Sequence, residues 1–354
     1  MHIAIDTSPL HNGHTNRGVG GYTKNLIESL HMYEPAHAYI PFDSKHQHPP
    51  KADIIHYPFF DPFFLTLPFH SIAPSIVTVH DLIPIVFPEH FPKGLRGGFR
   101  WQIQKYSLQK KQRIITDSEC SKKDIVRLTG IPEKKIDVIY LAPSLKLLPA
   151  TDNFDVLKKQ YGIQNDYFLY VGDVNWNKNI PGLLRAYAQF INNQLYKNKE
   201  LRTLILVGKA FLNQNLKETI AINQMCRELG IEKYIIRTGY IPDDSLVSLY
   251  SHARSLIQPS LYEGFGLPVL DAMALGCPVI CSWSSSLSEI AGPSIMVDAK
   301  NYISIADGMA RIISLTKEER KILIKESSEW AKRFTWKKVA KETVQSYEKI
   351  LGTL

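Results

Sequence analysis

Residues 259–282 read PSLYEGFGLPVLDAMALGCPVICS, and the residue types in this stretch predict a strand, a tight turn and a helix. Gly264 and Gly266 let the chain turn and bring backbone N–H groups close to a ligand. Pro268 suits the first position of a helix, because its missing N–H would be unpaired there anyway. Since the free amides and the dipole of a first helical turn favour anions, the stretch predicts a phosphate or diphosphate site.

Two carboxylates flank this turn. Asp271 is expected in the first or second turn of the helix, where side chains lean back toward the N-terminus and so toward the same pocket. A carboxylate repels a phosphate but accepts two hydrogen bonds from a diol such as ribose. Glu263, before the turn, would suit a second polyol on the far side of the phosphate. Ribose, diphosphate and sugar in a row describe a nucleotide sugar; the open alternative is a pair of acids that only complement the helix dipole.

The same alternation of strands and helices continues outward along nearly the whole chain. It predicts parallel sheets with helices on both faces, and therefore an α/β fold of two doubly wound domains. The expected strands are 2–6, 53–57, 75–81, 113–119 and 137–140 in a first series and 167–173, 203–208, 234–239, 254–260, 277–282 and 294–298 in a second.

A domain boundary is expected near residue 150, because residues 141–155 contain two prolines and little periodicity. The length of 354 residues also exceeds what one hydrophobic core usually supports. Ligands of doubly wound sheets bind beyond the carboxyl ends of the strands, so two such domains can share one cleft.

Composition limits the class of protein. Hydrophobic residues make up 44% and charged residues 21%, and no apolar run reaches the roughly 18 residues of a membrane span. The N-terminus is expected to be a buried strand rather than a signal peptide, which predicts a cytoplasmic protein. The four cysteines follow no zinc-binding pattern and are expected in the core. The net charge of +8 favours anionic partners: nucleic acid, phosphorylated small molecules or an acidic membrane.

Residues 17–26, RGVGGYTKNL, match a dinucleotide-binding fingerprint only in part, because Thr23 stands where the third glycine belongs. The match is weak evidence for NAD. A turn at Gly20 and Gly21 would still bring the backbone close to a ligand, with a helix expected from about Tyr22.

Taken together, these segments resemble the retaining glycosyltransferases of family four, whose GT-B fold has two facing Rossmann-like domains and a C-terminal helix that crosses back. The resemblance implies an acceptor-side domain over 1–150 with the helix at about 335–354, and a donor domain over 151–334. The similar segments are 18–30, 77–91, 115–125, 170–187, 238–280 and 333–351.

The resemblance also implies the residues of the site. The transferred sugar is expected to contact Glu263 and His80, and the leaving diphosphate to contact Lys178, without a metal or other cofactor. The implied donor-binding residues are Gly20, Gly21, Gly172, Gly264, Phe265, Gly266, Leu267 and Asp271.

Two positions depart from the family pattern. Asp271 replaces the usual second glutamate of the E-x7-E signature and shortens its reach by one methylene. Asp173 stands where an arginine commonly follows the glycine of YVG, which removes one expected diphosphate contact.

The resemblance to mannosyltransferases, carried by HDLIPIVFPE at 80–89, implies GDP-mannose as the donor and a glycan or lipid-linked hydroxyl as the acceptor, as in polysaccharide biosynthesis. Two alternatives stay open: a nucleotide-sugar epimerase of the GT-B type, and a basic nucleic-acid-binding protein. The second lacks any recognisable binding motif, so no nucleic acid is expected as a partner.

A membrane contact is a further hypothesis for the first domain. Phenylalanines at 59, 60, 63, 64 and 69 precede the basic, amphipathic stretch 93–113. The plain interpretation is a loop packed on a helix with a solvated face. The alternative is a surface for a lipid-linked acceptor or an anionic membrane, which would place the protein peripherally at the inner membrane face. His56, at the end of an expected strand, is expected to border the acceptor.

Overall fold

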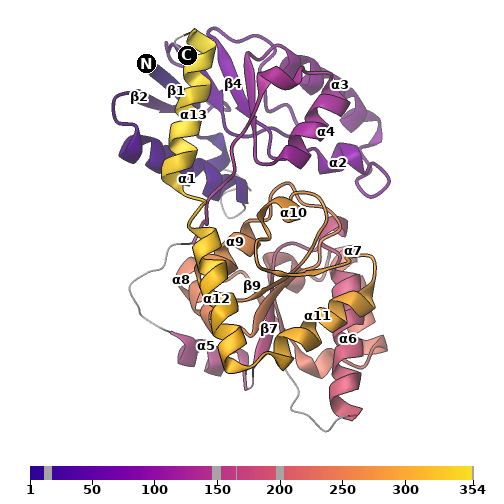
Figure 1. Cartoon of the computed structure of the whole chain (residues 1–354). Coiled ribbons are helices and arrows are strands. Elements are labelled where there is room, and N and C mark those ends of the chain that lie inside the picture. Colours follow the sequence, from indigo (N-terminus) through magenta and orange to yellow (C-terminus); the bar gives the residue numbers. More distant parts are fainter. Residues whose placement is uncertain (12–17, 146–152, 165, 197–202, 353–354) are drawn as a thin grey trace. The chain divides into compact units, whose positions relative to one another are not determined.

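The computed structural model describes residues 1–11, 18–145, 153–164, 166–196 and 203–352. The chain divides into two compact units, Met1–Ser144 with Phe334–Leu354 (unit 1) and Leu145–Arg333 (unit 2) (Figure 1). The boundary expected near residue 150 lies outside the described residues. Within the described ranges, no helix is both long and apolar enough to cross a membrane.

Unit 1 is built on a six-stranded parallel sheet in the order β2-β1-β3-β4-β5-β6. Its central strands β3 and β4 are buried along their whole length, as expected for a sheet covered on both faces. The strands are β1 (His2–Asp6), β2 (Ala38–Phe42), β3 (Ile54–Tyr57), β4 (Ser75–Thr78), β5 (Arg113–Thr116) and β6 (Ile136–Val138). The helices are α1 (Gly18–Tyr33), α2 (Ile83–Val86), α3 (Gly94–Gln109), α4 (Glu119–Thr129) and α13 (Trp336–Leu351), with 3-10 turns at Ser8–Leu10 and Glu133–Lys135.

The last helix, α13, completes unit 1 although it follows unit 2 in the chain. The Thr335 side chain caps its N-terminus, and the helix packs along α1. Tyr347 is fully buried and reaches the sheet, where its hydroxyl lies 2.7 Å from His56 Nδ1. The expected return of the C-terminal helix to the first domain is therefore confirmed.

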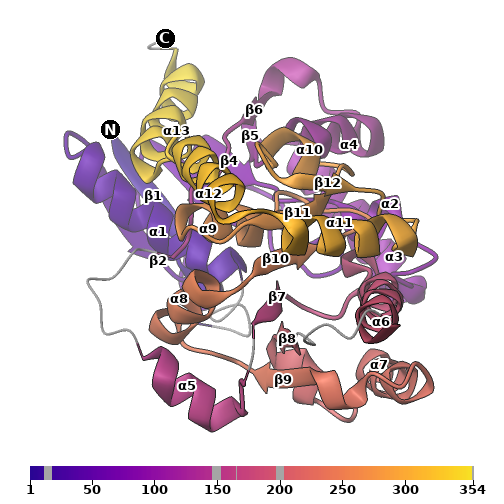
Figure 2. The same cartoon turned by 60° about the horizontal axis from the view of Figure 1, so that its bottom comes forward.

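Unit 2 repeats the architecture with the strand order β12-β11-β10-β7-β8-β9 (Figure 2). The helices α6, α7 and α11 lie over one face, and α5, α8, α9 and α12 lie over the other. The strands are β7 (Tyr167–Val171), β8 (Thr203–Val207), β9 (Ile235–Gly239), β10 (Ser255–Gln258), β11 (Val279–Ser282) and β12 (Ile295–Val297). The helices are α5 (Phe154–Tyr161), α6 (Ile180–Tyr196), α7 (Lys217–Glu228), α8 (Asp243–His252), α9 (Leu267–Ala274), α10 (Leu287–Ile290), α11 (Tyr302–Ser314) and α12 (Lys317–Ala331), with 3-10 turns at Trp176–Lys178, Lys209–Leu212 and Glu232–Tyr234.

Strand order fixes where a ligand can bind in unit 2. The chain builds β7, β8 and β9 in one direction and then returns to place β10 on the other side of β7. The strand order therefore reverses at the carboxyl ends of β7 and β10, and the crevice expected at such a point is where doubly wound sheets bind ligands.

The predicted α/β fold of two parallel sheets is confirmed. One strand, β2, was not expected, and one helix begins earlier than expected, because α1 already includes Gly20 and Gly21.

Candidate active site

The two loops at the crevice of unit 2 are tied together by asparagine side chains and backbone bonds. Leu261 N donates to Asn177 O at 2.8 Å, and Asn177 Nδ2 donates to Tyr262 O at 2.9 Å. Asn179, in the left-handed conformation at φ 56°, donates through Nδ2 to Pro259 O at 3.0 Å. The loop after β7 is thus held in register with the loop after β10, although their residues are some 80 positions apart in the chain.

This register brings two predicted catalytic residues into direct contact. Lys178 Nζ lies 2.8 Å from Glu263 Oε1 and 2.7 Å from Oε2. The two side chains are only 18% and 6% exposed. Glu263 Oε1 also accepts hydrogen bonds from Gln258 Nε2 at 2.9 Å and Ser260 Oγ at 2.7 Å. The carboxylate is therefore held by three donors, and its geometry is fixed before any ligand arrives.

The predicted glycine turn connects Glu263 to α9. Gly266 adopts φ +108° at the helix N-cap, a conformation that favours glycine, and a Cβ there would lie 2.5 Å from Leu287 Cδ2. Phe265 is buried, and the single hydroxyl proton of Ser286 is shared between Glu263 O at 2.9 Å and Phe265 O at 3.0 Å. The serine fixes the carbonyl groups of the turn.

Of the amides expected for anion binding, the first turn of α9 leaves that of Leu267, because Pro268 has no N–H and Val269 N donates to Gly266 O at 2.9 Å. This turn begins at Leu267, which is followed by Pro268. The helix start predicted from Gly264, Gly266 and Pro268 is therefore confirmed.

Asp271 is buried in α9, and its Oδ1 accepts a hydrogen bond from Leu145 N at 3.1 Å. Part of its acceptor capacity thus stabilises the chain where unit 2 begins. Gly172 directly follows β7 and donates through its amide to Val207 O. Asp173 Oδ1 accepts from the amide of Val174 at 2.8 Å, so the acid at the usual arginine position stabilises its own loop.

In unit 1, His80 follows β4 and pairs with an acid that the sequence analysis did not select. His80 Nδ1 lies 2.6 Å from Asp117 Oδ2, and Nε2 lies 3.2 Å from Pro58 O. The Tyr22 ring packs edge-on against the imidazole at 4.7 Å between centroids. Asp117 could have been found from its position, because it directly follows β5, and β5 lies beside β4 in the sheet. Neighbouring parallel strands bring their carboxyl ends to the same edge, so a residue after β5 is expected near His80.

The electrostatics favour a charged imidazole. Burial alone would lower the pKa of His80, but the Asp117 carboxylate, together with Asp81 and the Pro58 carbonyl, outweighs burial and raises the pKa. Burial raises the pKa of Asp117 despite the opposing effect of His80. Because both ring nitrogens face acceptors, the protonated ring can donate from both, and the pair retains its proton more readily than either group would in water.

His56 does not border an acceptor, contrary to expectation. It is fully buried, with Nδ1 beside the Tyr347 hydroxyl and Nε2 2.9 Å from Thr78 Oγ1. Burial lowers the pKa of His56 to about 3, so the ring is neutral. The residue is a core histidine that connects α13 to the sheet.

Gly20 and Gly21 lie in the first turn of α1 rather than in a loop before it, because the helix already includes Gly18. A Cβ on Gly21 would meet nothing within 4 Å, which shows that the space beside it is open.

Comparisons with known proteins agree with this architecture. The family model described as glycosyl transferases group 1 matches residues 153–330, and that described as glycosyltransferase family 4 matches 18–142. The O-antigen chain mannosyltransferase B of Escherichia coli is 32% identical over 284 residues, covering 79% of this chain and 71% of the relative. An MMP alpha-(1->4)-mannosyltransferase of Mycolicibacterium hassiacum is 26% identical over 261 residues, covering 72% and 59% of the two chains.

Solved structures show the same fold. Sucrose-phosphate synthase of Thermosynechococcus elongatus has a TM-score of 0.76 and 19% identity and covers all of both chains. Anabaena Alr3699/HepE in complex with UDP-glucose has a TM-score of 0.71 and 17% identity, covering 100% of this chain and 99% of the other.

Proposed function

The chain belongs to the glycosyl transferases group 1 family and is a glycosyltransferase with the GT-B fold, and we propose that it transfers mannose from GDP-mannose with retention of configuration. The proposed acceptor is a hydroxyl of a glycan or a lipid-linked glycan. The choice of sugar is supported by the mannosyltransferase names of the relatives and by residues 80–89.

The observation that carries the mechanism is the ion pair of Lys178 and Glu263 at the crevice of unit 2. Glycosyl transfer has an oxocarbenium-like transition state, and negative charge grows on the departing diphosphate. The Lys178 ammonium and the Leu267 amide that opens α9 would stabilise that charge. Glu263 would hold sugar hydroxyls, and Asp271 would hold the ribose. These groups need no metal, so we propose a reaction without one.

His80 would donate a hydrogen bond to a hydroxyl of the sugar. Its Nε2 contact to Pro58 O is long, at 3.2 Å, and a sugar hydroxyl can replace it. Asp117 holds the ring through Nδ1, which makes it a positioning residue in this scheme.

Ligand-dependent stability tests the donor. A ligand that binds only the folded state raises the free energy of unfolding by about 2.7 kcal/mol at 100 times its Kd. GDP-mannose and GDP should raise the melting temperature more than UDP-glucose and UDP, and turnover should require an added acceptor. Stabilisation by UDP-sugars alone would refute the proposed donor. Conversion of the donor without acceptor would favour an epimerase, and loss of activity with a chelator would refute the metal-free reaction.

We also propose a peripheral contact of unit 1 with an anionic membrane at its cytoplasmic face. Leu95 and Phe99 are exposed on α3, and Phe64 and Leu65 are exposed in the loop between β3 and β4. Arg100 lies among them, with its guanidinium 5.9 Å from the centre of the Phe64 ring. Exposed apolar side chains interleaved with basic ones suit the interface between lipid headgroups and acyl chains.

A further inference from the structure

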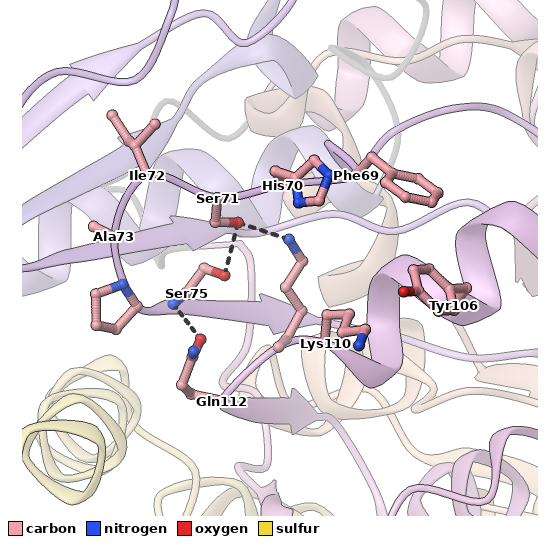
Figure 3. Close-up of a pocket in the computed structure, with 11 residues that line it drawn as sticks. Phe69, His70, Ser71, Ile72, Ala73, Ser75, Tyr106, Lys110 and Gln112 are labelled. Carbon is pink, nitrogen blue, oxygen red and sulfur yellow. Dashed lines mark hydrogen bonds between the residues drawn. The ribbon is translucent and has the colours of Figure 1, made fainter.

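A second cavity lies in unit 1, away from the carboxyl ends of the strands. It has a volume of about 450 Å³ and is lined by residues 69–75 and by side chains from α3 and the turn after it (Figure 3). Residues 69–75 lead into β4, and residues 110–112 lead into β5. The cavity is therefore at the amino ends of the two strands whose carboxyl ends carry His80 and Asp117.

The unusual feature of this cavity is a buried lysine without an acidic partner. Lys111 is only 3% exposed, and its Nζ donates to Ser71 Oγ at 2.9 Å. The ammonium also lies 5.2 Å from the centre of the Tyr57 ring. In the described ranges no ion pair joins Lys111 to a carboxylate, and burial lowers its pKa to about 8. A charge removed from water without a partner is costly to the fold, so an anionic ligand would be strongly favoured beside it.

The groups around Lys111 suit a phosphate. Ser71 and Ser75 place their hydroxyl oxygens 3.1 Å apart, and Lys110 lines the same cavity (Figure 3). A phosphate has several acceptor oxygens and can accept hydrogen bonds from an ammonium and from hydroxyls at once. Neutral sugars would leave the ammonium charge uncompensated.

The remaining walls indicate that the ligand has an organic part. Phe69 and Tyr106 stack with their centres 5.1 Å apart, and Ile72 is 73% exposed at the edge of the cavity. The volume falls in the range of about 300–1,000 Å³ that small-molecule sites occupy. A bare phosphate would fill only part of this space and would leave the aromatic wall without a contact.

We propose that this cavity binds the phosphate group of an organic phosphate ester, with the Lys111 ammonium as its counter-charge and the Ser71 and Ser75 hydroxyls as further partners. The ester is either a lipid headgroup or a water-soluble phosphate. The site does not depend on the transferred sugar, and it would remain if the donor were not GDP-mannose.

Calorimetry on the full chain at pH 7 tests the site with inorganic phosphate, glycerol 3-phosphate and a monomeric short-chain phosphatidic acid. Lys111→Met should weaken binding of the esters at least 10-fold, while Lys123→Met, at an exposed position on α4, should not change it. Wild-type protein that binds none of the three probes, or an unchanged affinity in Lys111→Met, would overturn the proposal.

Stability separates a binding role from a structural one. Methionine has a similar shape and carries no charge, so Lys111→Met should not lower the melting temperature without ligand, and it should abolish the rise that the esters cause in wild type. If Lys111→Met does not fold, Ser75→Ala keeps the ammonium and removes one phosphate partner; it should weaken ester binding several-fold. If Lys111→Met does not fold and the esters raise the melting temperature of Ser75→Ala as much as that of wild type, Lys111 has only a structural role.

The same titrations identify the source of the phosphate. If the short-chain phosphatidic acid binds at least 10-fold more tightly than glycerol 3-phosphate, the phosphate belongs to a lipid headgroup. Equal affinities assign a soluble ester. Because these probes need neither donor nor turnover, their failure is distinguishable from a failure of the proposed transfer reaction.

Discussion

At the scale of single residues, the contact between Lys178 and Glu263 decides how the site should respond to mutation. Glu263→Gln keeps the shape of the side chain but removes the charge that holds Lys178. We expect the fold to persist and turnover at saturating donor to fall by about 100-fold or more, because a preorganised contact to the reacting sugar is lost. Steady-state kinetics with added acceptor measure this loss, and turnover near the wild-type value would contradict the assignment.

Lys178→Ala should lower kcat/KM by at least about 100-fold, or roughly 2.7 kcal/mol of transition-state stabilisation. The reason is that the contact of Lys178 to the diphosphate tightens as negative charge develops. The double variant with Glu263→Gln should lose less than the sum of the two single losses, because each residue positions the other. Fully additive losses would mean that the observed ion pair has no role in arranging the site.

Asp271 has both a structural and a proposed binding role, and two substitutions separate them. Asp271→Ala leaves the buried amide of Leu145 unpaired, which costs about 1–3 kcal/mol of folding free energy, and should also raise KM for the donor. Asp271→Asn keeps an oxygen for Leu145 and should restore the melting temperature but not KM. Equal KM values for Asp271→Asn and wild type would remove Asp271 from donor binding.

Asp117→Asn should lower the pKa of His80, because burial would remain while the carboxylate that opposes it is lost. A histidine whose folded pKa is raised contributes stability that is fully present below its unfolded pKa, about 6.5, and is lost as the pH rises through the folded value. NMR titration of the imidazole carbon signals in both proteins measures the shift. A His80 pKa that stays the same in Asp117→Asn would show that the pair is not coupled.

Sequence reasoning succeeded at this scale where a residue belongs to a local pattern. Gly264, Gly266 and Pro268 are close in the chain, so their turn and helix start could be predicted. The pairing of Asp117 with His80 and the burial of His56 against Tyr347 were missed, because these partners are 37 and 291 positions apart in the chain.

At the scale of elements, the entry into α9 depends on the backbone of Gly266. Gly266→Ala should cost about 1–2 kcal/mol for the left-handed conformation and about 1–3 kcal/mol more for the contact with Leu287. The displaced turn should also lower activity. Gly162→Ala is the matched control, since Gly162 has φ +66° but open space for a Cβ. Denaturant unfolding measures the loss of stability in both variants. Equal losses in Gly266→Ala and Gly162→Ala, with full activity in Gly266→Ala, would contradict this role of the turn.

Most strands could be predicted because buried parallel strands are continuous apolar runs. The strand β2 was missed because its sequence, AYIPF, contains a proline, which usually argues against a strand. The sheet order explains the exception: β2 lies at an edge and pairs only with β1, so Pro41 can be accommodated where a central strand would need both rows of hydrogen bonds.

At the scale of the whole molecule, the proposed membrane contact predicts salt-sensitive binding to anionic vesicles. Replacement of Arg96, Arg100 and Lys105 with glutamine should weaken binding roughly 100-fold, at about 1 kcal/mol per charge. Lys317, Lys321 and Lys325 are exposed on α12, and their replacement with glutamine should leave binding unchanged. Vesicle sedimentation at two ionic strengths measures the effect. Wild-type protein that does not sediment with the vesicles would refute the contact.

The division of unit 1 into two stretches of chain has a consequence for biosynthesis. Unit 2 is continuous and can fold once residue 333 has left the ribosome, whereas unit 1 is started first and finished last. At about 5–20 residues per second, translation leaves the emerging sheet without α13 for roughly 10–40 s. During that interval the face of α1 that α13 later covers, and the polar group of His56 that Tyr347 later satisfies, are open to other chains. A nascent chain of this topology would therefore gain from a chaperone that covers its first 144 residues while the rest is made.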